Sequence, residues 1–345
     1  MAMPQPTIAT THSGFGGVEV GAAAAGFRSL WRIEIDPAIA AIADGNLEGE
    51  TTVADILSVD PANLEVPDAI HFSPVCKRAS VATHAGESAE DVAHGQWIAR
   101  FVDHHQPRII TLENVWPYRN FSAFQIVLAA LVRNGYFYDF ERVNAANFGV
   151  PQTRRRLILR AIRGSLLPPL PPPVSWAGWY AAIEDLIPSL PASKLAKWQL
   201  ARLPAEIQGA LLVDSAGYPD KTGARVPVCR HKNEPANYEK RPMRAILISG
   251  QNTSNEWGEI YRDANMPAQT VVASSKGIPR VALPGRVFRV TPHALARFQS
   301  FPDSYKLPAS HALACRGIGN AVPTLLAQRI YEQLIMILQC RPILV

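Results

Sequence analysis

Short apolar runs followed by small or polar residues recur through the first half of the chain, and stretches with helical spacing of apolar residues separate them. This alternation predicts strands and helices in turn, and so an α/β fold around a largely parallel sheet. The clearest predicted strands are residues 30–36, 68–72 and 108–115, and the clearest predicted helices are residues 37–46, 91–104 and 124–134.

Several reactive or polar side chains follow these predicted strands directly. Cys76 lies on the loop that leaves the strand at residues 68–72, and Glu113 ends the strand at residues 108–115. Ligands of open α/β sheets bind at the carboxyl ends of the strands. Lys77 and Arg78 would stabilise a thiolate at Cys76, whereas an isolated cysteine is otherwise more often a buried apolar residue.

A glycine-rich turn lies near the N-terminus, between a β-prone run and a helix. It comprises Ser13, Gly14, Phe15, Gly16 and Gly17. Such a turn lets the backbone approach a nucleotide-like ligand, although similar turns also occur for packing alone. Glu34 ends the next strand roughly 20 residues later, where a carboxylate binds ribose hydroxyls in nucleotide-binding units. Asp55 follows a further short strand and could be either a ligand or a plain helix cap.

The second half of the chain differs in composition. A proline-rich connector at residues 168–173 precedes predicted helices at 181–187 and 194–212, a basic stretch at 218–244, and strands within 245–283 that include 269–273. A helix at residues 323–337 closes the chain and is most simply part of the core. Arg154, Arg155 and Arg156 would usually form a solvated edge, but beside an active-site loop they could bind phosphate.

The overall composition is that of a core-forming globular protein, with 48% hydrophobic and 18% charged residues among 345. No apolar run approaches a membrane span and no signal peptide is recognised, so a cytoplasmic location is expected. The four cysteines lack metal-ligand spacing, which predicts no metal site. A net charge of +5 suits a polyanion partner without establishing one.

Taken together, these motifs resemble the DNA cytosine-5 methyltransferases. The glycine turn, Cys76, the segment Glu113-Asn114-Val115 and the segment Gln152 to Arg156 stand in that family's order, and they are followed by residues 289–303 and 317–323. The chain also departs from the family pattern. Val75 and Lys77 flank the cysteine in place of proline and glutamine, Thr10 and His12 replace an aspartate and a phenylalanine, and Ala294 replaces a common glutamate.

The resemblance implies a Rossmann-like, S-adenosylmethionine-dependent methyltransferase domain with a smaller target recognition domain. It predicts a catalytic domain at residues 1–165, a target recognition region at 166–285 and a C-terminal segment at 286–345 that completes the catalytic domain. The cofactor residues that it implies are Ser13, Gly14, Phe15, Gly16, Gly17, Glu34, Ile35, Asp55, Ile56, Pro74, Asn320 and Ala321.

The same resemblance implies a mechanism. Cys76 would attack C6 of a cytosine flipped out of the duplex, so that C5 can accept the methyl group. Glu113 would hold the N3/N4 edge of the base, Arg156 its O2, and Arg154 the loop or a phosphate. The polar segment at residues 80–95 could close over the base.

The expected partner is double-stranded DNA, bound by a monomer, and a cognate restriction endonuclease could accompany it. The DNA-binding candidates are Lys77, Arg78, Ser80, Gln152, Arg225, Arg230, Lys232, Arg241 and Arg244. Two alternatives stay open: a DNA-binding homologue with weak turnover, and an enzyme with another acceptor, such as RNA or a free pyrimidine nucleotide. The large middle region argues against a free nucleotide, because a small substrate needs no recognition lobe.

Overall fold

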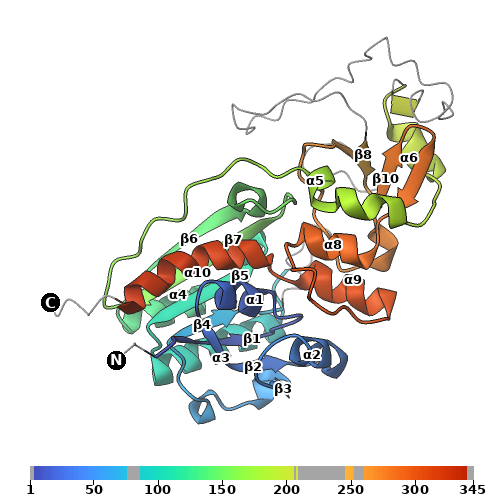
Figure 1. Cartoon of the computed structure of the whole chain (residues 1–345). Helices are drawn as coiled ribbons and strands as arrows, with labels where there is room; N and C mark the ends of the chain where they lie inside the picture. The colour runs from blue at the N-terminus through green and yellow to red at the C-terminus, as the bar shows by residue number, and fades with distance from the viewer. Residues whose placement is uncertain (1–3, 76–85, 206, 209–244, 252–259, 340–345) are drawn as a thin grey trace. The chain divides into compact units, whose positions relative to one another are not determined.

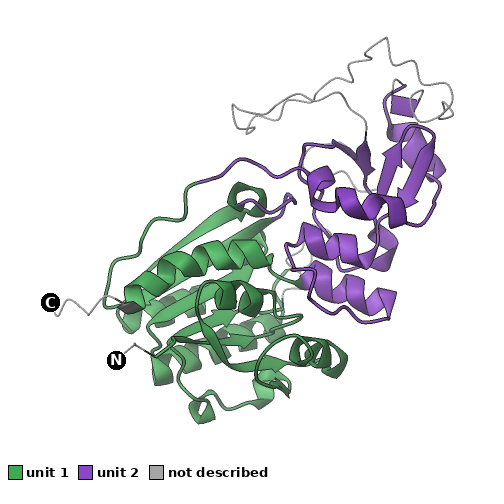
Figure 2. Ribbon diagram, in the orientation of Figure 1, with its two compact units in different colours: residues 1–148, 155–172, 321–345 green, residues 149–154, 173–320 purple. Residues whose placement is uncertain are grey.

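The computed structural model describes residues 4–75, 86–205, 207–208, 245–251 and 260–339, and the chain forms two compact units. Unit 1 comprises residues 1–148, 155–172 and 321–345, and unit 2 comprises residues 149–154 and 173–320 (Figure 2). Residues 286–320 therefore pack within unit 2, although the sequence prediction assigned them to the segment that completes the catalytic domain. The functional division of the chain stays a prediction.

Unit 1 is built on a seven-stranded sheet with the order β3-β2-β1-β4-β5-β7-β6 (Figure 1). The strands up to β5 run parallel, and β7 runs antiparallel to both β5 and β6. This arrangement confirms the predicted α/β, Rossmann-like fold. The strands are β1 Thr7–Thr11, β2 Arg28–Glu34, β3 Thr51–Val53, β4 Ala69–Phe72, β5 Ile109–Asn114, β6 Tyr136–Asn144 and β7 Arg155–Arg163.

The helices of unit 1 connect these strands. They are α1 Gly17–Ala24, α2 Pro37–Asp44, α3 Ala89–His105, α4 Ser122–Arg133 and α10 Thr324–Gln339, with short 3-10 turns η1 Ile56–Ser58, η2 Pro61–Asn63, η3 Trp116–Asn120 and η4 Ala145–Phe148. A capping box between Ser88 and Asp91 starts α3. Residues 89–95 of the predicted closing segment are therefore the beginning of a helix. Among the described residues, no helix is both long and apolar enough to cross a bilayer.

The two faces of the sheet differ in character. Ile70 and Phe72 of β4 lie in one apolar cluster with Trp97 and Phe101 of α3 and Phe124 of α4. Because side chains alternate along a strand, the intervening residues of the central strands point to the other face. That face carries a laterally paired row of buried polar residues: Arg32, Thr10, His71, Thr111 and Arg160.

Hydrogen bonds satisfy the centre of this polar row. His71 Nδ1 lies 2.7 Å from Thr111 Oγ1, and His71 Nε2 lies 2.9 Å from Ser73 Oγ. Thr111 Oγ1 also lies 2.6 Å from Tyr331 OH of α10. Burial lowers the pKa of His71 to about 3, so the imidazole is neutral at physiological pH. The network links α10 to Ser73, on the loop that leaves β4.

Unit 2 contains a four-stranded antiparallel sheet with the order β11-β10-β8-β9. Its elements are β8 Ile246–Ile248, β9 Tyr261–Asp263, β10 Arg280–Leu283, β11 Arg286–Arg289, α5 Trp179–Ile183, α6 Lys197–Arg202, α8 Pro292–Phe298 and α9 His311–Asn320, with 3-10 turns η5 Glu184–Ser189 and η6 Ser275–Gly277. The helix predicted at residues 194–212 is confirmed at α6 and again at residues 205 and 207–208, with a break at 203–204, while residues 206 and 209–212 lie outside the described residues.

The strand predicted at residues 269–273 is wrong. This segment bonds instead to the loop before β7, where Val271 N donates to Gln152 Oε1 at 2.7 Å and Thr270 Oγ1 donates to the Thr153 carbonyl at 2.6 Å. The segment therefore bonds to residues 152 and 153 and forms no strand.

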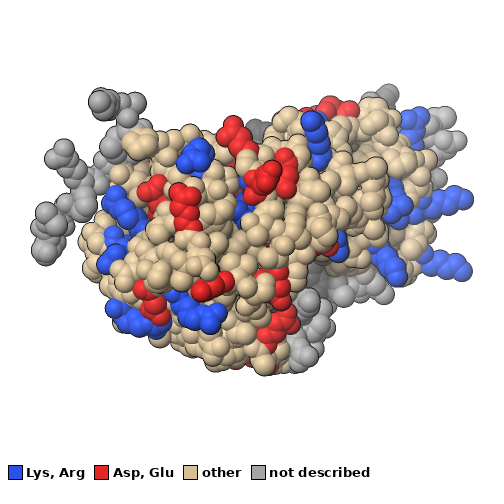
Figure 3. Space-filling model, turned by 90° about the horizontal axis from the view of Figure 1, so that it is seen from below, with Lys and Arg blue, Asp and Glu red and all other residues tan. Residues whose placement is uncertain are grey.

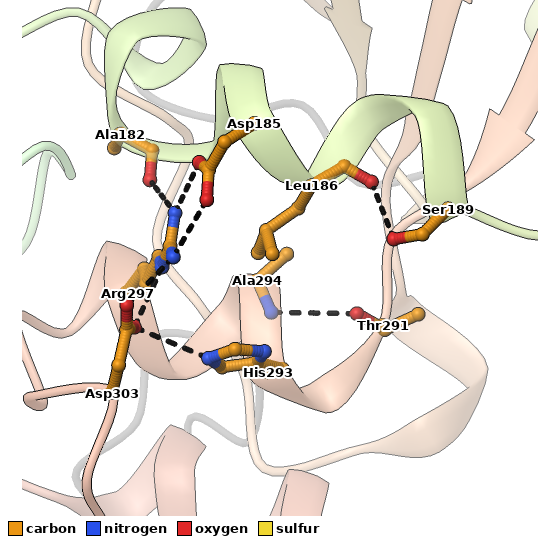
Figure 4. A network of polar contacts seen from close by, with 9 residues as sticks. All are labelled: Ala182, Asp185, Leu186, Ser189, Thr291, His293, Ala294, Arg297 and Asp303. Atoms are coloured by element: carbon orange, nitrogen blue, oxygen red, sulfur yellow. Dashed lines mark hydrogen bonds and ion pairs between the residues drawn. The ribbon is translucent and has the colours of Figure 1, made fainter.

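An ion-pair network ties helical segments of unit 2 together (Figure 4). Arg297 of α8 pairs with Asp185 of η5, with Nη1 to Oδ1 at 2.5 Å, and its Nη2 lies 2.7 Å from Asp303 Oδ2. His293 Nε2 lies 3.2 Å from Asp303 Oδ1. Bonding to Arg297 lowers the pKa of both carboxyls. The motif at residues 289–303 therefore has a structural role within its own unit.

Candidate active site

The residues that the sequence singled out in unit 1 gather at the carboxyl edge of its parallel strands. The glycine turn follows β1, Glu34 ends β2, Pro74 follows β4, and Glu113 is the second-to-last residue of β5. Strands β1 and β4 are neighbours in the middle of the sheet, where the strand order reverses. Ligands of open α/β sheets bind outside such a reversal point.

The glycine turn combines left-handed backbone with close packing. His12, Gly14 and Gly16 have φ values of 55°, 57° and 69°. A side chain added at Gly17 would place its Cβ 2.3 Å from the Val322 carbonyl oxygen and 3.4 Å from the Ala321 Cβ. Gly17 is therefore required by packing, whether or not a ligand is present. The structure brings it together with Ala321, another predicted cofactor residue.

Glu34 ties the end of β2 to the glycine turn. Its Oε2 accepts a hydrogen bond from Gly14 N at 2.9 Å, and its Oε1 accepts one from Asp36 N at 3.0 Å. Asp55 is exposed and accepts a hydrogen bond from Leu57 N at 3.0 Å, which makes it the cap of η1. The neighbours Ile35 and Ile56 differ, since Ile35 is exposed and Ile56 is buried. Ligand contacts of these residues stay predictions.

Three buried polar atoms near the turn have no hydrogen-bond partner among the described residues: His12 Nε2, Ser13 Oγ and Glu19 Oε2. The His12 ring meets that of His94 edge-on, with centroids 5.0 Å apart. Burial and the neighbouring His94 lower the pKa of His12 to about 3. His12 is thus a neutral aromatic ring at the position where the resembling family has phenylalanine. The Phe15 side chain is fully buried, and its contact with a cofactor stays a prediction.

Glu113 and Arg156 form a largely buried ion pair at the ends of β5 and β7. Glu113 Oε1 lies 2.9 Å from Arg156 Nε, and the two side chains are 10% and 17% exposed. Burial lowers the pKa of Arg156. Next to this pair, Asn114 Nδ2 donates to the Pro74 carbonyl at 2.9 Å and so holds the start of the cysteine loop. The pair presents a carboxylate and a guanidinium side by side, which suits a planar base that carries both donors and acceptors.

The other predicted catalytic and loop residues fall into two groups. Cys76, Lys77, Arg78 and Ser80 lie outside the described residues. Arg154 belongs to unit 2, where it is buried and donates from Nη1 to the Val271 carbonyl at 3.2 Å. Its catalytic role stays a prediction. Asn320 ends α9 in unit 2 and is exposed, and its cofactor contact likewise stays a prediction.

Gln152 has an internal role in unit 2. It is fully buried, and its Nε2 donates to Gln299 Oε1 at 2.8 Å and to the Phe298 carbonyl at 3.1 Å. With Val271 N donating to its Oε1, both ends of the amide are engaged within the protein. The DNA contact of Gln152 stays a prediction.

The remaining DNA-binding candidates, Arg225, Arg230, Lys232, Arg241 and Arg244, lie outside the described residues. The described part of unit 2 offers other cations that the sequence analysis missed. Lys194, Lys197 and Arg286 are exposed, and Ser193 N donates to the Val287 carbonyl at 2.8 Å, which lays this segment along β11. Figure 3 shows Lys and Arg side chains projecting from the surface of unit 2. The link between this lysine segment and Arg286 is the pairing with β11, which joins residues about 90 positions apart and has no local sequence signal.

Comparison with known proteins gives a consistent picture. The model of the family described as C-5 cytosine-specific DNA methylase matches residues 7–336. Type II methyltransferase M.AplI of Arthrospira platensis is 28% identical over 352 residues, which cover 98% of this chain and 88% of that protein. Type II methyltransferase M.XorII of Xanthomonas oryzae pv. oryzae is 26% identical over 396 residues, which cover 99% and 87%.

Solved structures agree in fold. The S. pombe Dnmt2 methyltransferase superposes with a TM-score of 0.60 at 14% identity, over 97% of this chain and 99% of that one. The Entamoeba histolytica methyltransferase EhMeth superposes with a TM-score of 0.58 at 14% identity, over 97% and 99%.

Proposed function

This chain belongs to the C-5 cytosine-specific DNA methylase family, and on that premise we propose that it transfers a methyl group from S-adenosylmethionine to C5 of cytosine in duplex DNA. The observation that supports this most is the Glu113–Arg156 pair at the edge of the sheet, with Oε1 and Nε 2.9 Å apart. A carboxylate and a guanidinium held together in this way can contact the N3/N4 edge and the O2 of one cytosine.

The proposed chemistry begins at Cys76. Cytosine C5 is a weak nucleophile, and attack of the Cys76 thiolate at C6 makes C5 enamine-like. Arg156 stabilises the charge that develops at O2, while Glu113 favours a proton at N3. The bound cofactor supplies an electrophilic methyl group. Loss of the C5 proton to a base then allows the Cys76 sulfur to leave and restores the aromatic ring.

The residues around the glycine turn fit an S-adenosylmethionine molecule. Glu34 can accept ribose hydroxyls, and the neutral His12 ring offers an apolar face. The orphaned Ser13 Oγ and Glu19 Oε2 are polar atoms that a bound ligand, or water ordered by it, could satisfy. Pro74, held by Asn114, lies between this turn and the Glu113–Arg156 pair along the same sheet edge.

Unit 2 is the proposed target recognition lobe. Lys194, Lys197 and Arg286 would bind DNA phosphates, which positions the lobe without reading sequence. The target cytosine would be flipped out of the duplex, because C6 is inaccessible inside a stacked helix. The Type II names of the relatives support a role beside a cognate restriction endonuclease.

The test is transfer of radiolabelled methyl from S-adenosylmethionine to unmethylated duplex DNA of mixed sequence, with RNA and a free cytidine nucleotide as alternative acceptors. The proposal predicts label in duplex DNA with the wild type and none with Cys76→Ala. Label in RNA alone would identify the other acceptor class. DNA binding without label would identify a binding protein, and Val75→Pro with Lys77→Gln would then be the reversion to make.

A further inference from the structure

Glu19 is a buried carboxyl group that the proposed chemistry does not use. It lies in the first turn of α1 and is 2% exposed. Its Oε1 accepts a hydrogen bond from Thr10 Oγ1 of β1, and its Oε2 has no partner within the part of the chain that the structure describes. Leaving an ionisable group buried with an unsatisfied oxygen costs free energy, which calls for a functional reason.

The carboxyl group lies directly behind the glycine turn. A Cβ added at Gly16 would be 3.6 Å from Glu19 Oε2, so this oxygen approaches the backbone of the turn. Glu34 contacts the same turn through Gly14 N at 2.9 Å. Two carboxylates therefore flank the backbone that is proposed to hold the cofactor.

Glu19 also coincides with a departure in the sequence. Thr10 stands where the family motif has an aspartate. The hydroxyl of Thr10 donates the hydrogen bond that Glu19 Oε1 accepts. In this chain the carboxylate beside Thr10 therefore comes from helix α1, at Glu19. A structural helix residue at this position would need no carboxylate bonded to Thr10.

We propose that Glu19 supplies the carboxylate missing at Thr10, and that its charge, acting through the glycine turn, makes the site prefer cationic S-adenosylmethionine over the thioether product. The inference rests on the proposed function, because it concerns the same cofactor site. Methyl transfer removes the positive charge from sulfur, so a negative charge nearby favours the substrate and aids release of the product.

The charged and titratable groups around Glu19 set its protonation. Burial is the main cause that raises its pKa, and Glu34 of β2 adds to this, whereas the Thr10 hydroxyl and Arg32 of β2 oppose it. Burial raises the pKa of Tyr331 of α10, and the nearby Glu19 charge adds to this. Arrival of a cation favours the ionised carboxylate, and the released proton passes to the buffer. Thioether binding provides no such cation at sulfur.

Isothermal titration with S-adenosylmethionine and with S-adenosylhomocysteine tests the inference without an activity assay. Titration in two buffers with different ionisation enthalpies counts the protons released. We expect wild type to release more protons with S-adenosylmethionine than with the thioether. In Glu19→Gln this difference disappears, and the preference for S-adenosylmethionine falls by about tenfold. An unchanged preference in a folded Glu19→Gln variant would overturn the inference.

The exchange variant Thr10→Asp/Glu19→Thr is the matched control, because it returns the carboxylate to the strand. We expect it to regain the preference that Glu19→Gln loses, which a merely structural role of Glu19 would not produce. If Glu19→Gln does not fold, the proton count of the wild type decides: equal release with both ligands refutes the inference. A wild type that binds neither ligand would refute the proposed function itself.

Discussion

Replacing Arg156 by methionine tests how the Glu113–Arg156 pair holds the proposed base pocket. At the observed 2.9 Å, two unit charges attract by about 6 kcal/mol at an effective dielectric constant of about 20. Desolvation offsets part of this attraction. Because the side chains keep 17% and 10% exposure, leaving Glu113 without its cation should cost about 3 kcal/mol, the low end for buried pairs. The melting temperature of the 345-residue chain should fall by roughly 4 °C.

The assay is a double-mutant cycle read by denaturant unfolding of wild type, Arg156→Met, Glu113→Gln and the double variant. Each single change leaves one partner buried alone, whereas the double change removes both charges. We expect the double variant to recover about 2 kcal/mol relative to the sum of the single changes. If the two single variants lose less than about 0.5 kcal/mol each and their effects simply add, the pair does not stabilise the site and this reasoning is refuted.

Three further predictions follow from unit 1. Gly17→Ala should lower the stability of the cofactor-free protein by about 1–3 kcal/mol, because the added Cβ clashes with backbone. Gly14→Ala meets no atom within 4 Å and should cost only about 1 kcal/mol, for its left-handed φ. Thermal unfolding of the two variants measures the difference. Tyr331→Phe should cost about 1 kcal/mol in denaturant unfolding, because Thr111 loses a buried partner. The pKa of Glu19 is raised in the folded state, so the wild type loses stability as pH rises above the unfolded pKa of about 4.3. Glu19→Gln removes this loss, and it should therefore stabilise the protein above about pH 5 and not below about pH 4. Denaturant unfolding at a series of pH values measures the difference.

The sequence predicted the elements whose signals are local. Strands β4 and β5 were predicted from short runs rich in apolar residues, and the structure has both. The helix predicted at residues 37–46 begins as expected, with Asp36 capping α2 by accepting hydrogen bonds from Ala38 N and Ile39 N. These features depend on neighbours within a few residues, which a single sequence displays.

Features that depend on distant partners could not be predicted. Residues 269–273 read as a strand, but their hydrogen bonds go to residues 152 and 153. Gly17 read as a ligand contact, and only the fold shows that its Cβ would meet the Val322 carbonyl. Glu19 was not among the residues that the sequence singled out. Its bond to Thr10 crosses from α1 to β1, so the replacement of the motif aspartate carried the only hint of it.

The most direct test of the account is the identity of the methylated nucleoside. Duplex DNA incubated with the protein and S-adenosylmethionine would be digested to nucleosides and analysed by mass spectrometry, with Cys76→Ala alongside. The account predicts 5-methyldeoxycytidine with the wild type and none with the variant. A methyl group on adenine or on the cytosine amino nitrogen, or equal 5-methyldeoxycytidine with both proteins, would contradict it.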